Sequence, residues 1–169
     1  MRASKLVEPA PRNATQQVFD IHSVPGHLIR RAQQIAVAIF VEETAETDLT
    51  PIQFALLAEL ERASGVDQVT LAALIAVDVA TFGQVVTRLE ERGLVVRESD
   101  PVDRRRKRLA LTSAGRSCLK RAIPAVRSAQ ARILAPLDAI EQAELCRLLA
   151  KLVEQNNDAS RAPMRRVTG

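Results

Sequence analysis

The chain contains no tryptophan and no tyrosine, and its four phenylalanines make up only 2% of its 169 residues. Proteins that bind single-stranded nucleic acid usually stack bases on aromatic rings, so this composition argues against that class. Strands also favour aromatic and β-branched residues. Because 47% of the residues are nevertheless hydrophobic, we expect an aliphatic core packed between helices.

Cysteine is scarce as well, and the two present, Cys118 and Cys146, lie in helical patterns with apolar neighbours. We expect both to be small core residues rather than parts of a disulfide scaffold. No apolar run approaches the length needed to cross a membrane, and residues 1–20 lack the pattern of a signal peptide. The expected location is therefore the cytoplasm, with no membrane partner.

Motifs that commonly mark enzymes are also missing: there is no glycine-rich phosphate loop, no nucleophile elbow and no metal-binding helix. The only histidines, His22 and His27, are five positions apart with no cysteine nearby, which gives little support for zinc. We predict that the chain is not an enzyme and uses no metal or cofactor.

What the chain does contain is a run of five cations, Arg104-Arg105-Arg106-Lys107-Arg108, between two short apolar segments, 94–96 and 109–111. Crowded like charges disfavour a compact fold unless a polyanion neutralises them. The run follows a turn signal, Asp100-Pro101-Val102-Asp103, and a helical pattern that ends at Arg92-Gly93. The order of helix, strand, basic turn and strand predicts a winged helix that binds double-stranded DNA.

The fold class that we expect is mainly α, with about six helices and a small hairpin wing. Capping residues and apolar spacing set the boundaries. The predicted helices cover 25–46, 51–63 behind a capping box at Thr50–Gln53, 71–77 behind Thr70, 79–92 behind Asp78, a long helix after Thr112 that bends at Pro124 and ends before Pro136, and a last helix from Asp138 to about Asn156.

The helix over 79–92 divides into two faces. Phe82, Val85, Val86 and Leu89 form an apolar face, which leaves small and polar groups on the other. With the short helix before it, this pattern predicts a helix-turn-helix whose second helix enters the major groove. The candidate DNA contacts are Thr81, Gly83, Gln84, Thr87 and Arg88.

Each of these groups suits a role at a base edge or phosphate. Gln84 can pair with adenine in a bidentate manner, and Arg88 can reach a guanine or a phosphate. Thr81 and Thr87 can bond to bases or phosphates, and Gly83 lets the backbone approach closely. Gln84 and Arg88 could instead be ordinary exposed helix residues, and the cation run could be a solvated loop.

Several of these motifs together resemble the MarR family of winged-helix transcriptional regulators, over roughly residues 24–156. The most specific matches are Arg88-Leu89-Glu90-Glu91-Arg92-Gly93-Leu94-Val95, the wing from Asp100 to Lys107, Leu109-Ala110-Leu111-Thr112, and Gly115. The segment Ala80-Thr81-Phe82-Gly83-Gln84 departs from the Ser-Thr-Val-Thr-Arg of many relatives. That departure leaves the operator sequence open.

The resemblance implies roles for the wing and an assembly. Arg105 would enter the minor groove, braced by Asp103, while Arg104, Arg106 and Lys107 would contact phosphates. It also implies a homodimer of interleaved terminal helices. The expected organisation is a flexible arm (1–22), dimerisation helices (23–48 and 113–157), a DNA-binding domain (49–112) and a disordered tail (158–169).

The segment from Pro25 to Gln34 resembles a subgroup that responds to aromatic acids or their CoA thioesters. Arg30 and Arg31 could hold a carboxylate or phosphate, although surface ion pairs are an equal alternative. His27 lies in the same region, and Phe40 and Phe54 could line an apolar pocket.

The resulting hypothesis is a repressor that binds a palindromic operator as a homodimer and is released by a small anionic aromatic effector. The alternative is a nonspecific architectural DNA-binding protein without an effector, which footprinting would distinguish.

Overall fold

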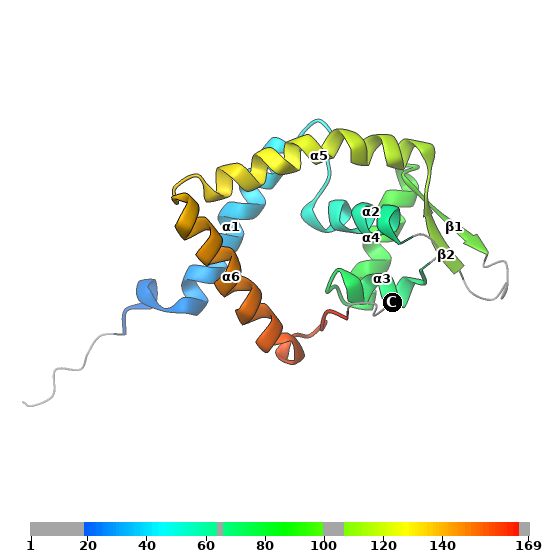
Figure 1. Ribbon diagram of the computed structural model, residues 1–169. Helices are drawn as coiled ribbons and strands as arrows, with labels where there is room; N and C mark the ends of the chain where they lie inside the picture. Colours follow the sequence, from blue (N-terminus) through cyan, green and yellow to red (C-terminus); the bar gives the residue numbers. More distant parts are fainter. Residues whose placement is uncertain (1–18, 64–65, 100–106, 166–169) are drawn as a thin grey trace, which may run out of the picture.

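The computed structural model describes residues 19–63, 66–99 and 107–165, and within them the chain is mainly helical with one two-stranded hairpin. Figure 1 shows α5 running along the length of the molecule, from a lobe of short helices and the hairpin at one end to α1 and α6 at the other. This is the expected winged-helix architecture. In chain order the elements are η1 (Ile21–Ser23), α1 (Pro25–Glu43), α2 (Pro51–Arg62), α3 (Gln68–Leu74), α4 (Val79–Glu91), β1 (Val95–Ser99), β2 (Lys107–Leu111), α5 (Ser113–Leu134), α6 (Ala139–Gln155) and η2 (Asn157–Ala159).

The hydrophobic core lies in the lobe formed by α2, α3, α4, the hairpin and the first half of α5, and it is almost entirely aliphatic. Phe82 of α4 is its one fully buried aromatic side chain among the described residues. Burial of leucine side chains from several elements holds the lobe together, because each contributes roughly 1.5–3 kcal/mol when removed from water. The fully buried leucines are Leu56, Leu57, Leu71, Leu89 and Leu109.

Four predicted helix starts are present with their caps. Thr50 and Gln53 form a reciprocal capping box, with N–O distances of 3.0 and 3.3 Å. Asp78, Thr112 and Asp138 each accept a hydrogen bond from the first turn of the following helix. A cap needs only residues within three positions, so the sequence alone is enough to predict it.

Three helix boundaries differ from the prediction. The start of α3 is capped by Asp67, whose Oδ1 accepts from the Thr70 nitrogen at 3.0 Å, so the helix begins three residues before Leu71. It also ends at Leu74, since Ala76 adopts a φ of 52°. The first helix ends at Glu43 rather than Glu46, because Thr44 forms its C-cap and the chain turns at Asp48, where φ is 49°.

Pro124 lies inside α5, which continues as one helix from Ser113 to Leu134, and Pro136 follows the C-cap residue Ala135. The predicted end of the long helix is therefore confirmed. Of the two cysteines, Cys118 is buried in the core as expected, whereas Cys146 is exposed on α6, which contradicts the prediction that it is a core residue.

The hairpin has the position predicted for the wing. The strands β1 and β2 are antiparallel, with Val95 opposite Leu111 and Ser99 opposite Lys107. Gly93 provides the turn between α4 and β1 with a φ of 68°, a conformation that other residues rarely adopt. The predicted wing-tip residues Asp103, Arg104, Arg105 and Arg106 lie outside the described residues.

Residues 158–165 fall in the segment that the sequence predicts to be a disordered tail, yet the structure places them. The chain leaves α6, forms η2 and then runs to α3 in the other lobe (Figure 1). Among the described residues no single helix is long and apolar enough to cross a membrane, and only α3 and α4 together, as a pair bent by 105°, reach the necessary length and composition.

Candidate DNA-binding surface and ligand pockets

The helices α3 and α4 form a helix-turn-helix. Their axes turn by 105°, which is within the range typical of this motif. The start of α4 is fixed by Asp78, which accepts from the Thr81 nitrogen at 3.0 Å and from the Thr81 hydroxyl at 2.8 Å. The hydrogen bond from the Thr81 nitrogen is the main cause of a lowered pKa of Asp78, and the hydroxyl adds to it. Asp78 therefore remains ionised. The Thr81 hydroxyl donates its hydrogen bond to this carboxylate within the cap.

The exposed face of α4 is a shallow groove of about 480 Å³, lined by Ala80, Gly83, Gln84, Thr87, Arg88 and Glu91. Four of the five DNA contacts predicted on this helix therefore share one surface, while Thr81 sits in the cap. On the opposite face, Phe82, Val86 and Leu89 are at most 1% exposed. The amphipathic pattern that predicted a recognition helix is thus present in the folded chain.

Two details of this surface bear on the predicted DNA contacts. A Cβ built on Gly83 meets no atom within 4 Å, so packing inside the protein does not require glycine there. The Thr87 hydroxyl donates to the Gly83 carbonyl oxygen at 3.0 Å, and its remaining capacity is as an acceptor. Sequence reasoning missed Glu91, whose carboxylate lines the same groove and could accept from a cytosine amino group.

The wing is tied to the recognition helix by an ion pair. Arg97 on β1 lies 2.5 Å from the Glu90 carboxylate on α4, with both side chains partly buried. Lys107 is the first residue of β2, and Arg108 forms a β-bridge with Asp67 beside α3. These contacts fix the base of the wing against both helices of the helix-turn-helix.

The C-terminal end of α4 is anchored to the α1–α2 turn by Arg92, which sequence reasoning did not single out. Its two terminal nitrogens donate to the carbonyl oxygens of Asp48 and Thr47, each at 2.7 Å. Charge-assisted hydrogen bonds of this kind are short and comparatively strong. Because its partners lie 44 and 45 residues away, no local sequence signal could have identified this anchor.

The candidate effector residues fall into two groups. The rings of Phe40 and Phe54 pack edge to face with centroids 6.1 Å apart, whereas Arg30 donates to Gln34 at 2.9 Å on an exposed face of α1. His27 packs against His22, with ring centroids 5.3 Å apart, and Arg31 is exposed. Ten helical residues separate Arg30 from Phe40, about 15 Å along the axis, so one chain does not bring the cations and the rings together.

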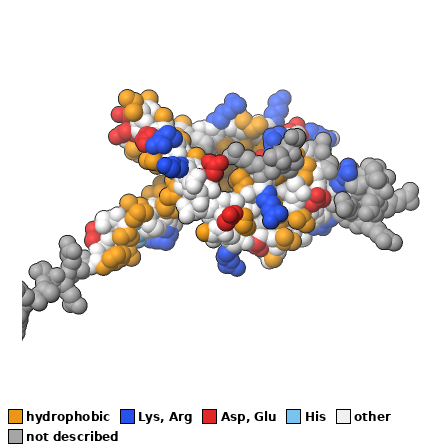
Figure 2. Space-filling model, turned by 60° about the horizontal axis from the view of Figure 1, so that its bottom comes forward, with side chains coloured by type: hydrophobic (Ala, Val, Ile, Leu, Met, Phe, Trp, Pro, Cys, Tyr) orange, Lys and Arg blue, Asp and Glu red, His pale blue; other side chains and the backbone are white. Residues whose placement is uncertain are grey.

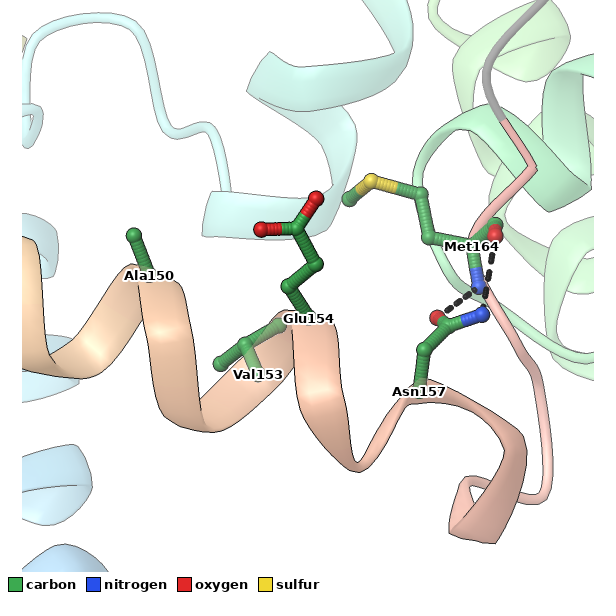
Figure 3. A pocket seen from close by; sticks show the side chains of 5 residues that line it. All are labelled: Ala150, Val153, Glu154, Asn157 and Met164. Carbon is green, nitrogen blue, oxygen red and sulfur yellow. Dashed lines mark hydrogen bonds between the residues drawn. The ribbon is translucent and has the colours of Figure 1, made fainter.

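A separate pocket of about 350 Å³ lies at the end of α6 (Figure 3). It is lined by Ala150, Val153, Glu154, Asn157 and Met164, and it contains none of the predicted effector residues. Among the described residues that line it, the only charged group is the Glu154 carboxylate. An anionic ligand would be repelled there, so this pocket does not suit an aromatic acid.

Comparison with known proteins agrees with this geometry. Residues 47–106 match the MarR family. The HTH-type transcriptional repressor NicR of Pseudomonas putida is 33% identical over 92% of this chain and 99% of its own length. The structure of Bordetella bronchiseptica BpsR, described as regulated in DNA binding by 6-hydroxynicotinic acid, is 31% identical with a TM-score of 0.76, covering 80% of this chain and 97% of that one.

The structure of the transcriptional repressor CouR, bound to a 23-mer DNA duplex, is 32% identical with a TM-score of 0.74, covering 78% of this chain and 94% of that one. CouR has also been solved with p-coumaroyl-CoA. The groove on α4, the hairpin that follows it and these likenesses agree. The chain belongs to the MarR family and is a DNA-binding transcriptional repressor of that type, not an enzyme.

Proposed function

We propose that this repressor binds a palindromic operator as a homodimer and is released by a small anionic aromatic effector. The observation that carries the proposal is the exposed surface of α4. Gly83, Gln84, Thr87 and Arg88 line one groove there, and the opposite, apolar face of the helix is fully buried. Base-reading groups of this kind are unnecessary in a protein that only coats DNA, so the surface favours a specific operator.

Unpaired apolar surfaces at the far end of the molecule support the homodimer. No residue of α6 is buried, and Figure 2 shows hydrophobic side chains along the projecting arm formed by η1 and the start of α1. Large exposed apolar surfaces are rare on monomers and usually mark an interface. The large apolar side chains that are at least 36% exposed include Ile21, Leu28, Ile29 and Ile35 near the N-terminus, and Ile140, Leu145, Leu148, Leu149 and Leu152 on α6.

A two-fold axis between two copies would present two α4 helices to DNA. Half-sites about one helical turn apart, roughly 34 Å, would then be related as a palindrome. The wing-tip residues Asp103, Arg104, Arg105 and Arg106, with Lys107, would grip the flanking minor groove and phosphates.

For the effector we propose an aromatic carboxylate or its CoA thioester, in keeping with the ligands named for BpsR and CouR. Arg30, Arg31 and His27 supply the polar contacts, and Phe40 and Phe54 the apolar wall. Since these groups are apart within one chain, the dimer has to complete the pocket with elements of the second copy.

Selection of duplexes from a random library, followed by footprinting, tests the DNA part. We expect one discrete protected palindrome. Uniform coverage at all sequences would instead support the architectural alternative, in which no base is read.

Thermal shift with 6-hydroxynicotinic acid and p-coumaroyl-CoA tests the effector part. A ligand at one hundred times its dissociation constant should stabilise the protein by roughly 2.7 kcal/mol, and it should release the selected duplex. If neither compound does so, and neither do related aromatic acids and thioesters, the effector proposal is wrong while operator binding stands.

A further inference from the structure

The segment that follows α6 crosses to the DNA-binding lobe and is held there by hydrogen bonds. The Asn157 side chain closes a loop around Met164: its Oδ1 accepts from the Met164 nitrogen at 2.8 Å, and its Nδ2 donates to the Met164 oxygen at 3.2 Å (Figure 3). The next residue, Arg165, donates its backbone N–H to the Ala73 oxygen at 3.1 Å. Together these three bonds fix the chain path up to α3.

The attachment point matters because α3 is the first helix of the helix-turn-helix. In complexes of this motif the first helix crosses the DNA backbone while the second lies in the major groove. Ala73 is in the last turn of α3, and the turn after it leads directly into α4. The residue attached here therefore lies beside the helix that, in this motif, crosses the DNA backbone.

Arg165 is free to act there. Its side chain is exposed, and it has no ion-pair partner among the residues that the structure describes. Its attachment uses only the backbone N–H, so the guanidinium is not consumed by the contact with Ala73. A guanidinium whose backbone is held on the DNA-binding lobe is well suited to a phosphate, which it can bind through two parallel hydrogen bonds.

We propose that the segment after α6 is a further DNA-contacting element, in which Asn157 and Ala73 hold the backbone and Arg165 binds a DNA phosphate beside α3. The proposal rests on DNA binding alone, and needs neither the effector nor the palindrome.

Measuring the salt dependence of binding to a selected duplex tests it. Arg165→Gln removes the charge but keeps the backbone N–H that bonds to Ala73. We expect the slope of log K against log salt to fall in magnitude by about 0.9, which corresponds to about eightfold weaker binding at 0.1 M salt and convergence with wild type near 1 M. Arg127→Gln, an exposed cation on α5, changes the net charge equally and should leave the slope near that of the wild type.

Asn157→Ala tests the anchoring. This variant should bind the duplex more weakly than the wild type, as Arg165→Gln does. The double variant should bind no more weakly than Arg165→Gln alone. A wild-type slope in Arg165→Gln, or an equal loss in Arg127→Gln, would overturn the proposal and leave the segment as a structural link between the lobes. Wild-type protein that selects no duplex would be a different result, because it would contradict the repressor function itself.

Discussion

Individual residues decide how closely the wing and α5 approach each other, and Gly115 is the clearest example. It lies in the first turn of α5, where its nitrogen donates to the Thr112 hydroxyl at 2.9 Å. A Cβ at this position would lie 2.0 Å from the Leu94 oxygen and 3.0 Å from the Leu94 carbonyl carbon. Backbone atoms cannot move aside cheaply, so only glycine fits.

Gly115→Ala should therefore destabilise the protein by about 1–3 kcal/mol, as overpacking in other proteins does. Urea unfolding followed by circular dichroism would measure this. Gly26→Ala is the matched control, because a Cβ there meets nothing within 4 Å, and its stability should be unchanged or slightly higher. Equal stability of the two variants would show that the Leu94 backbone can move away from the added Cβ at little cost.

Gln84 is the residue on which base preference depends in our proposal. Gln84→Ala should reduce discrimination at one base pair of each half-site by about 1–3 kcal/mol, because a bidentate contact is lost. Competition binding against single-base variants of the selected operator would show it. A loss of affinity that is uniform across all sequences would indicate that Gln84 contacts only the backbone.

Residue roles were predictable from sequence when their partners are near in the chain. Asp78 and Thr81 are three positions apart, and the face containing Gln84 follows from helical spacing. The roles of Arg92 and Gly115 were not predictable in this way. Arg92 bonds to the carbonyl oxygens of Thr47 and Asp48, and Gly115 packs against the carbonyl of Leu94, and these partners are distant in sequence. Gly115 was noted only through its resemblance to a family motif.

At the scale of elements, the junction between α1 and α5 depends on charge. Arg132 of α5 pairs with Glu43 at 2.5 Å and with Glu42 at 3.1 Å, both in the last turn of α1. The hydrogen bond from Arg132, followed by one from Ser128, lowers the pKa of Glu43 below 4.5. The carboxylate form is therefore favoured in the folded protein.

A pH dependence follows from this pKa. Since the folded-state pKa of Glu43 lies below its unfolded value, its contribution is fully present above pH 4.5 and is lost as the pH falls through the folded-state pKa. Thermal unfolding between pH 7 and pH 3 should show a smaller decline in Glu43→Gln than in wild type. Glu46→Gln, at an exposed position just after α1, should retain the wild-type decline; if both variants behave alike, the Arg132 pair is not responsible.

For the whole molecule, the arrangement leaves α6 as a 17-residue helix in which no residue is buried. Leu149 lies in its apolar stripe and is 44% exposed. Leu149→Lys should convert the proposed dimer to a monomer, because a charge would be buried in an apolar interface. Light scattering after size-exclusion chromatography would measure the mass, and operator affinity should fall with it.

Ala143→Lys provides the control for that change, since it adds the same charge to the opposite face of α6, where Ala143 is exposed. This variant should remain dimeric. A dimer in Leu149→Lys would mean that the interface lies elsewhere, for example on the apolar arm around Leu28 and Ile35.

The sequence by itself determined the type and order of the α-helices and the hairpin, four of the caps that start the helices, and the two faces of α4. These properties depend on neighbours within a few residues, whose spacing is read directly from the chain. Only the tertiary structure decided that Arg92 anchors α4 to the α1–α2 turn and that the segment after α6 attaches to α3 through the Arg165 nitrogen and the Ala73 oxygen. Both contacts join residues 44 or more positions apart, and they exist only once the elements have packed together.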